Sequence, residues 1–551
     1  MSLRTWGVYG VAGLLLLTAQ ARAADDSPAE RQSMEELRNT VVNLLQALVD
    51  KGLLTREQAE QLVKQAQDKA AKDAAALAAK NAAQAKEEQN AVRVPYVPQI
   101  VKDEISKQVA QEVKPAVVQD VVKEAKAEGW GVPASLPEWL SRVRMFGDVT
   151  IRGQADLFPK DNSYDQLLDF NAVNSAGGIT AAADPFIDTT EDRYRLRLRA
   201  RLGVEGDLTD TLRAYIRLAS GSLTQVAGSE SQTLGTYGNR YTVGIDQAYI
   251  VWDTSPASKL SFNTIEGGRT PNPWFTPTEL VYARDLTFEG VNDTMRVGWG
   301  EGGADRSHVY LTLGAIPMLE VPLQAQDDKW LLGAQLGTNL RFRDGNDHLR
   351  FAVAYYDFLK VSGELNSPYS VLLNYTAPPF VQWGNTMFNI ANNPSNPTED
   401  LFALAAHFRI VDLAANYEHA VGRYDFAVNA EAVRNIGYNL GEVEALSNES
   451  FNSPQDKGYV AEVSFGDPVV DRFGLWRVAL GYRYVQADAV IDAWTDADFH
   501  EGGTNTQGYY LWASFGFAPN TWVRLRYLSG NEITGPRYGD DIVQLDVNTR
   551  F

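Results

Sequence analysis

The sequence predicts an all-β transmembrane antiparallel β-barrel of about 16 strands, with 14 or 18 as the alternatives, preceded by an α-helical, coiled-coil-like arm. Three observations predict this fold. A short apolar segment with a cleavage site opens the chain, a helical pattern follows, and from about Arg144 the period changes to two. We therefore expect a signal peptide over residues 1–23, the arm and its connector over 24–142, and the barrel over 143–551.

The composition narrows the class of protein before any motif is considered. Across 551 residues the mean hydropathy is −0.27, too low for a bundle of membrane helices. A formal net charge of −20 argues against a nucleic-acid partner, which needs a basic surface. Aromatic residues make up 11% of the chain, which suits aromatic girdles at two membrane interfaces. Because there is no Cys, thiol catalysis and Cys metal sites are excluded.

The first residues predict export from the cytoplasm. Arg4 precedes an apolar stretch over residues 6–18, and Ala21-Arg22-Ala23 has the small-x-small pattern of a cleavage site. About 13 apolar residues are too few to span a bilayer, which takes about 20. We therefore interpret the segment as a secretory signal peptide rather than as an anchor helix.

A helical pattern covers residues 33 to about 126. Ser33 and Glu36 form a capping box, and residues 64–90 are rich in Ala, Lys, Gln and Glu with almost no large apolar residue. Such a helix buries little surface, so we expect a thin coiled coil or a projecting spacer. A small helical hairpin, disorder, and a periplasmic arm that oligomerises the protein or reaches the cell wall all stay open.

The clearest predicted strand carries arginines on alternate residues. They alternate with apolar residues over 194–204, a short turn follows, and the next strand returns with two more arginines on its polar side. The seven are Arg193, Arg195, Arg197, Arg199, Arg201, Arg213 and Arg217. A short turn on one side and long polar loops on the other are typical of a membrane barrel.

Alternating runs recur along the rest of the chain, and they end in an amphipathic tail. The runs are 149–157, 242–252, 259–266, 309–315, 331–340, 348–358, 404–410, 425–433, 459–465, 476–485, 509–517, 522–528 and 543–551. In the tail, Val543, Leu545, Val547, Thr549 and Phe551 share one face, and Gln544, Asp546, Asn548 and Arg550 share the other. A terminal aromatic is typical of the closing strand of an outer-membrane barrel. A soluble β-sandwich or propeller explains neither this tail nor the signal peptide.

The chain resembles the bacterial "putative porin" family with an N-terminal helical extension. The resemblance runs through five segments. They are Arg93-Val94-Pro95-Tyr96-Val97-Pro98, Gly129-Trp130-Gly131-Val132-Pro133, Gly268-Arg269-Thr270-Pro271-Asn272-Pro273-Trp274-Phe275, Asp285-Leu286-Thr287-Phe288-Glu289-Gly290-Val291 and Asp496-Ala497-Asp498-Phe499-His500-Glu501-Gly502-Gly503-Thr504-Asn505. The resemblance implies an outer-membrane diffusion channel and leaves the permeant open.

The alternating arginines are the strongest functional signal. Arginine keeps its charge at any relevant pH, so in a narrow channel these side chains would concentrate anions along the permeation path. Alternatively they pair with Asp and Glu on neighbouring strands or on an infolded loop and brace the wall. The two roles are compatible, and we predict that all seven arginines line the pore.

A proline-rich segment over residues 270–278 does not fit a central strand. Pro271, Pro273, Trp274 and Phe275 are therefore expected either in an extracellular loop or in a constriction loop folded into the lumen. Trp274 and Phe275 would then form an apolar slide for sugar-like solutes or act as membrane-interface anchors.

The remaining motifs predict neither catalysis nor a metal or cofactor. The five His show no zinc-ligand spacing, and no GxSxG elbow is present. An acidic cluster, Asp488, Asp492, Asp496, Asp498 and Glu501, resembles a calcium loop in composition but lacks the EF-hand spacing, so a solvated loop is the simpler interpretation. A TonB-type transporter needs a globular plug and about 22 strands. We therefore do not expect an enzyme.

Together these observations predict a passive porin in the outer membrane of a Gram-negative bacterium, with its arm in the periplasm and an anion preference. The expected partners are outer-membrane lipid and lipopolysaccharide, small hydrophilic solutes, further copies of the chain in a homo-oligomer such as a trimer, and peptidoglycan through the arm. The alternative function is a structural anchor, in which the barrel tethers the arm to the cell wall.

Overall fold

The computed structural model describes residues 142–551, except for 255–260, 300–306, 323–326, 343–345 and 397. The predicted signal peptide and helical arm lie outside the described residues, apart from the last residue of the arm, Arg142. In the part of the chain that is described, no helix has the length and hydropathy needed to cross a membrane.

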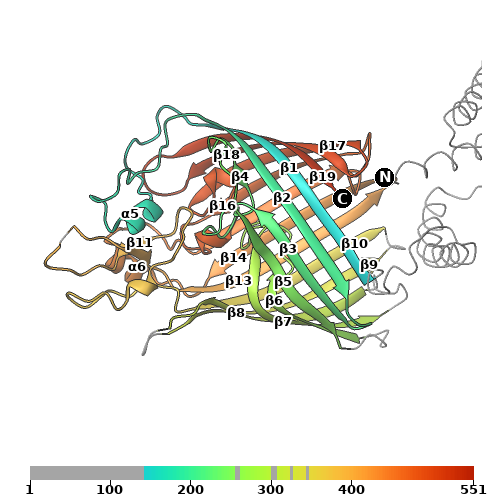
Figure 1. Cartoon of the computed structure of the whole chain (residues 1–551), viewed down its shortest axis with the longest axis horizontal. Helices are drawn as coiled ribbons and strands as arrows, with labels where there is room; N and C mark the ends of the chain where they lie inside the picture. The colour runs from blue at the N-terminus through green and yellow to red at the C-terminus, as the bar shows by residue number, and fades with distance from the viewer. Residues whose placement is uncertain (1–141, 255–260, 300–306, 323–326, 343–345, 397) are drawn as a thin grey trace, which may run out of the picture. The chain divides into compact units, whose positions relative to one another are not determined.

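One antiparallel sheet closes on itself through the pairing of its first and last strands (Figure 1). Seventeen strands belong to this sheet in the described residues; β4 is two residues long, and the other sixteen form the wall. These are β1 (Val143–Leu157), β2 (Arg193–Asp207), β3 (Leu212–Ser220), β5 (Val243–Asp253), β6 (Ser261–Pro271), β7 (Thr287–Trp299), β8 (Ser307–Leu319), β9 (Lys329–Phe342), β10 (Asp347–Leu359), β13 (Phe408–Val421), β14 (Tyr424–Asn435), β15 (Lys457–Gly466), β16 (Trp476–Val485), β17 (Thr506–Ala518), β18 (Thr521–Glu532) and β19 (Gly539–Arg550). The prediction of a closed antiparallel barrel of about 16 strands is confirmed.

The two ends of the barrel differ in their connections. At the short-turn end the strands are joined by tight turns such as 208–211, 422–423 and 519–520. At the opposite, long-loop end, the connections hold the small elements, and Figure 1 places α5, α6 and β11 there, away from the C-terminus. The small elements of the loops are β4 (Gln232–Thr233), β11 (Met387–Asn389), β12 (Phe402–Leu404), α5 (Phe170–Ala176), α6 (Leu440–Ser447), η4 (Asn374–Thr376), η5 (Asp492–Trp494) and η6 (Phe499–Glu501).

The C-terminal tail forms the closing strand, as the sequence predicts. Ten residues of β1 pair with β19, from Asp148 opposite Arg550 to Leu157 opposite Asp541. The ladder continues to Phe551, whose N–H donates to the Gly147 carbonyl at 3.0 Å. Leu545 is 50% exposed on the outside of the barrel, whereas Gln544 is fully buried inside it. The alternation of the tail therefore separates a lipid-facing side from an interior side.

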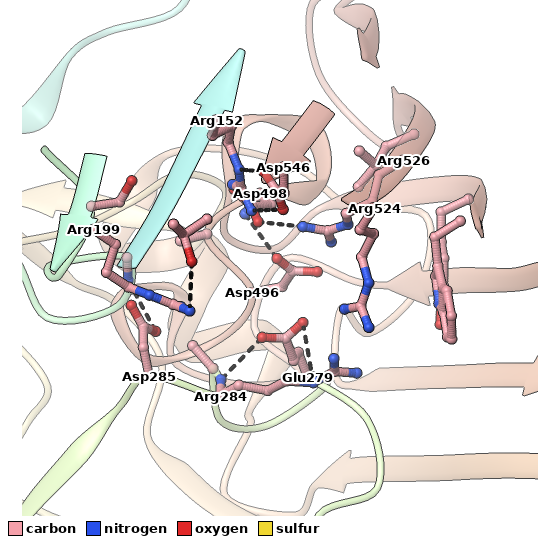
Figure 2. Close-up of a pocket in the computed structure, with 18 of the residues that line it drawn as sticks. Arg152, Arg199, Glu279, Arg284, Asp285, Asp496, Asp498, Arg524, Arg526 and Asp546 are labelled. Carbon is pink, nitrogen blue, oxygen red and sulfur yellow. Dashed lines mark hydrogen bonds and ion pairs between the residues drawn. The ribbon is translucent and has the colours of Figure 1, made fainter. Parts of the chain in front are cut away.

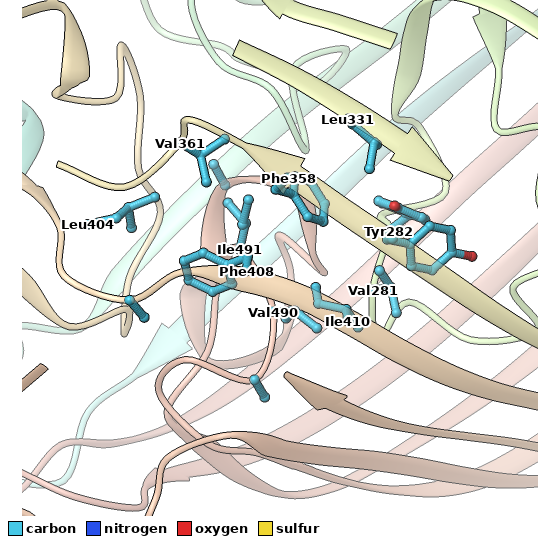
Figure 3. Close-up of a cluster of buried hydrophobic side chains, with 14 of the residues drawn as sticks. Val281, Tyr282, Leu331, Phe358, Val361, Leu404, Phe408, Ile410, Val490 and Ile491 are labelled. Atoms are coloured by element: carbon cyan, nitrogen blue, oxygen red, sulfur yellow. The ribbon is translucent and has the colours of Figure 1, made fainter. Parts of the chain in front are cut away.

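The inner face is not polar on every strand. An apolar core fills one side of the lumen (Figure 3). Residues 280–283 of the loop between β6 and β7 pack there against inward-facing side chains of the wall. Those wall residues include Phe288 of β7, Leu331 of β9, Tyr356 and Phe358 of β10, and Phe408 and Ile410 of β13. Their burial follows from contact with this loop and with other residues of the same core, such as Val490 and Ile491, and not with lipid.

This inner core also explains why the sequence patterns missed β7 and misplaced β13. On β7 the inward Phe288 is buried, while its neighbour Glu289 points outward and pairs with Arg269. The apolar and polar sides are thus inverted at the long-loop end of the strand. On β13, predicted over residues 404–410, Phe408 and Ile410 are apolar although they face inward, and the strand runs on to Val421.

Because Leu545 faces lipid, a charged side chain at this position should lower the free energy of unfolding, whereas a charge in an exposed loop should not. Replacing Leu545, which pairs with Gly153 and Leu525 in mid-strand, by Arg should lower the free energy of unfolding by about 2–4 kcal/mol. Leu223→Arg, in an exposed loop, is the matched control and should change it little. Urea titration of the protein folded into lipid vesicles measures both, and equal values for the two variants would contradict the assignment.

Candidate functional site

The loop between β6 and β7 (residues 272–286, the β6–β7 loop) lies inside the barrel and crosses it. The Phe275 N–H donates to the Gln335 side chain of β9 at 2.7 Å, and Gln335 donates back to the Phe275 carbonyl at 3.0 Å. Further along, the Thr278 N–H donates to Glu431 of β14 at 3.1 Å. Because Gln335 and Glu431 face inward from separate parts of the wall, these bonds hold the loop within the lumen.

Trp274 anchors this loop to the wall. It is only 4% exposed and contacts the rings of Tyr282, Phe288 and Tyr356 at 5.1–5.6 Å between centroids. A Cβ at Gly333 would lie 2.3 Å from the indole, so only glycine leaves room for it there. Trp274 is therefore neither a slide for solutes nor a membrane-interface anchor. The sequence also predicted Pro271, Pro273 and Phe275 for a constriction loop. Pro271 is the last residue of β6, and Pro273 follows within the β6–β7 loop. The Arg350 guanidinium lies over the Phe275 ring, 5.2 Å from its centroid.

A second infolded segment, the loop between β16 and β17 (residues 486–505, the β16–β17 loop), is joined to the first by hydrogen bonds. Thr495 donates from Oγ1 to the Leu280 carbonyl at 2.7 Å, and the Ala283 N–H donates to the Trp494 carbonyl at 2.8 Å. The buried Arg483 of β16 donates to the Glu279 carbonyl at 3.0 Å and to Thr495 at 2.7 Å. The two loops therefore form one hydrogen-bonded unit inside the barrel.

Beside these loops the lumen keeps a cavity of about 360 Å³ (Figure 2). Charged side chains dominate its lining. The arginines are Arg152, Arg197, Arg199, Arg201, Arg284, Arg483, Arg524 and Arg526, and the carboxylates are Glu279, Asp285, Glu462, Asp496, Asp498 and Asp546. The wall strands that line the cavity, β1, β2 and β15 to β19, are consecutive around the closed barrel. The cavity therefore lies along one side of the lumen.

The arginines of β2 occupy one face of the strand, and that face is the inner one. Between them, Tyr194 is 75% exposed, and Leu196 and Leu202 are also exposed on the lipid side. The inner face of β1 lies opposite in register, with Asp156 facing Arg193, Arg152 facing Arg197, and Asp148 facing Arg201. Polar side chains of two neighbouring strands are thus brought together inside the wall.

Carboxylates neutralise most of the seven predicted arginines. Arg201 pairs with Asp148 at 2.8 Å and with Glu230 at 3.0 Å, and Arg217 pairs with Glu230 at 3.0 Å and also with Asp246. Arg195 pairs with Asp156 at 2.5 Å and with Glu501 at 3.1 Å. Arg213 pairs with Asp253 at 3.0 Å, and Arg193 lies 3.9 Å from Glu501. The bracing role that the sequence left open therefore has a direct structural counterpart.

Three of the seven, Arg197, Arg199 and Arg201, line the cavity. Arg199 lies 3.4 Å from Asp148 and 3.9 Å from Glu230, both long for an ion pair. Among the described residues, no carboxylate comes within 4.0 Å of Arg197, which donates only to the Ser231 carbonyl at 3.4 Å. The positive charge of β2 that faces the cavity is thus concentrated on Arg197 and Arg199.

Asp498 of the β16–β17 loop connects two arginines of the wall. Its carboxylate lies 2.7 Å from Arg152 and 2.5 Å from Arg526, and Arg152 also binds Asp546 at 2.7 Å. Burial alone would raise the pKa of Asp498, but the charges of Arg152, Arg526 and Arg197 outweigh it and hold that pKa well below its ordinary value. Asp498 is therefore ionised, and it removes positive charge from the lumen.

Asp285, at the end of the β6–β7 loop, is in a different electrostatic state. Burial raises the pKa of its carboxyl to about 6, and the negative charge of Glu279 adds to this shift. The Gly228 N–H, donating to Asp285 at 3.3 Å, opposes the shift only in part. Asp285 therefore changes charge just below neutral pH while it faces the cavity.

The acidic cluster singled out from the sequence does not gather into one site. Asp488 accepts from Thr386 at 2.9 Å, whereas Asp498 is held by the two wall arginines. In the part of the chain that is described, no group of three His, Cys, Asp or Glu is arranged to hold a metal ion. The cluster is thus divided between the loop core and the cavity.

Several cavity residues were not singled out from the sequence. Arg524 and Arg526 alternate with Val523 and Leu525, which is the same signal as on β2 but with only two members. Arg152 is the single arginine within residues 148–156 of β1, where the other polar residues are of mixed type. Arg284 and Glu279 belong to an infolded loop, and no local pattern shows that a loop folds inward.

The family described as "Putative porin" matches residues 38–551 of the chain. No curated protein matches. Similar solved structures include the outer membrane channel DcaP of Acinetobacter baumannii, at 12% identity over 74% of this chain and 97% of that chain with a TM-score of 0.36. Another is OprB of Pseudomonas putida, at 10% identity over 75% of this chain and 96% of that chain with a TM-score of 0.43. Because the family match spans every strand of the barrel, the chain belongs to the "putative porin" family.

Proposed function

We propose that this protein is an outer-membrane porin through which small hydrophilic solutes diffuse passively, with a preference for anions. The observation that carries the proposal is the cavity inside the closed barrel, whose eight arginines outnumber its six carboxylates. Water-accessible charges of one sign in a confined space raise the local concentration of the opposite ion. The family match supports the channel function itself.

Residues of β2 carry the anion preference in this proposal. Arg197 and Arg199 face the cavity with little neutralisation, whereas the paired Arg193, Arg195, Arg201, Arg213 and Arg217 mainly stabilise the wall and add to the field. The other expected partners, lipid, lipopolysaccharide and further copies of the chain in a trimer, fit the exposed apolar outer face. Peptidoglycan binding and the tether function depend on the arm, outside the described residues.

Two substitutions of opposite sign test the anion preference. Arg199→Ala removes a cavity charge and should lower the anion-to-cation permeability ratio, by roughly twofold or more at low salt. Asp498→Asn should raise the ratio, because Arg152 and Arg526 lose a shared negative partner. Reversal potentials across planar bilayers in a KCl gradient measure both. A cation-selective wild type, or variants that shift in the same direction, would contradict the proposal.

The anion preference should also depend on pH through Asp285. Its carboxyl is neutral below a pKa of about 6 and negative above it, so the cavity loses net positive charge as pH rises from 5 to 7. The permeability ratio for anions should therefore fall over this interval. In Asp285→Asn that fall should be reduced, while the ratio at pH 5 stays close to that of the wild type. The same reversal-potential measurement at the two pH values checks this, and an unchanged pH profile in the variant would contradict the assignment.

A further inference from the structure

Arg524 of β18 stands out among the cavity arginines because its terminal nitrogens have no partner in the described part of the protein. Its Nε donates to Ser514 at 2.8 Å, and its guanidinium lies over the Trp512 ring at 4.7 Å from the centroid. No carboxylate of the described residues lies within ion-pair distance of it, while Figure 2 shows its guanidinium reaching into the cavity. The Trp512 ring and Ser514 thus fix its plane and leave its two Nη groups free.

The carboxylates near Arg524 are already committed to other groups. Glu462 accepts from Trp512 Nε1 at 3.0 Å and from Asn429 at 3.1 Å, so each of its oxygens has a donor. Asp546 is bound by Arg152 at 2.7 Å. Both attract Arg524 through space without pairing with it. Arg524 is therefore without a direct carboxylate partner in the described residues, and its charge is open to a mobile anion.

Arg284 of the β6–β7 loop lines the same cavity as Arg524. Its side chain is 61% exposed although the loop lies inside the barrel, and its ion pair with Glu279 is long, at 3.8 Å. Its positive charge acts directly on Arg524, as does that of Arg526. Two cations that line one cavity repel one another, and both keep N–H donors that no acceptor of the described residues takes up. An anion that enters between them stabilises both.

Independently of its missing partner, Arg524 has a distinctive position along the lumen, because it lies where two cavities adjoin. It lines the cavity of about 360 Å³ and also a neighbouring cavity of about 210 Å³, formed with residues 468–471 at the short-turn end. Trp512 and Trp522 are shared by both cavities in the same way. A solute that moves from one cavity to the other therefore passes the Arg524 guanidinium.

We propose that Arg524 and Arg284 form a saturable binding site for oxyanions, that is, for solutes with a carboxylate or a phosphate group. The planar fork of a guanidinium donates two parallel hydrogen bonds to such groups, which a chloride ion cannot accept in the same way. The site makes transport of oxyanions saturable while chloride passes by simple diffusion. This inference rests on the proposed porin function and names its solute class.

The experiment uses the purified full-length protein in planar bilayers at low salt, where electrostatic screening is weak. Chloride current is recorded while either inorganic phosphate or acetate is added at constant ionic strength. We expect the current to fall along a saturating curve for at least one of the two. Saturation with phosphate alone assigns the site to phosphate groups, and saturation with both assigns it to oxyanions in general.

The variants are Arg524→Gln, Arg284→Gln and the double substitution. Loss of one charge-assisted contact should raise the half-blocking concentration by about tenfold in each single variant. Arg524→Lys keeps the charge but not the fork, so it should still bind more weakly than the wild type. Arg537→Gln is the control, because Arg537 is exposed and pairs with Asp161 away from the cavity. It should leave the half-blocking concentration unchanged.

The outcomes separate this inference from the proposed function. A protein that conducts chloride but shows no saturable block by either anion, or a block that is the same in Arg524→Gln, overturns the oxyanion site and leaves the porin intact. A wild-type protein that conducts nothing overturns the function itself. If Arg524→Gln fails to insert, Arg284→Gln decides, because its side chain lies on a loop and pairs only weakly.

Discussion

Closure of the sheet between β1 and β19 is the constraint on which the rest of the structure depends. In a bilayer every backbone N–H and C=O needs a partner within the protein, and a barrel meets this need only when no strand edge is left open. The β1–β19 ladder, from Asp148 opposite Arg550 to Leu157 opposite Asp541, supplies those partners. Once the sheet is closed, one face of each strand is directed to lipid, so most charged side chains of the strands are gathered in the interior.

That gathering of charge explains why the loops fold inward. A buried arginine without a partner is costly, and the wall alone does not supply a carboxylate for each one. Asp498 of the β16–β17 loop binds Arg152 and Arg526, and Glu501 of the same loop binds Arg195. Glu230, from the loop after β3, binds Arg201 and Arg217. The loops and the wall therefore neutralise one another, and Arg197 and Arg524 are cavity arginines without a carboxylate at ion-pair distance in the described residues.

Sequence patterns predict those strands of this structure that have lipid on one face and polar groups on the other. β2 and β19 were recognised because lipid lies on one side and charge on the other, which gives a clear period of two. β7 was missed because Phe288 faces an apolar core inside the barrel. The pairing of Arg152 with Asp498 joins residues 346 positions apart, and no local period encodes it. The arginines of the site were thus partly predictable, whereas their partners and the infolded loops were not.

The β6–β7 loop determines which side of the lumen is filled by the apolar core and which side keeps the cavity. Residues 280–283 are buried against the inner faces of β9, β10 and β13 and fill that side with apolar side chains. The next two residues, Arg284 and Asp285, lie on the cavity side and supply one charge that is permanent and one that varies with pH. Packing and the charge of the cavity are therefore determined by adjacent residues of one short segment. A change in the apolar part would move the charged part, so the charge that a solute meets in the cavity is set by hydrophobic contacts on the opposite side of the lumen.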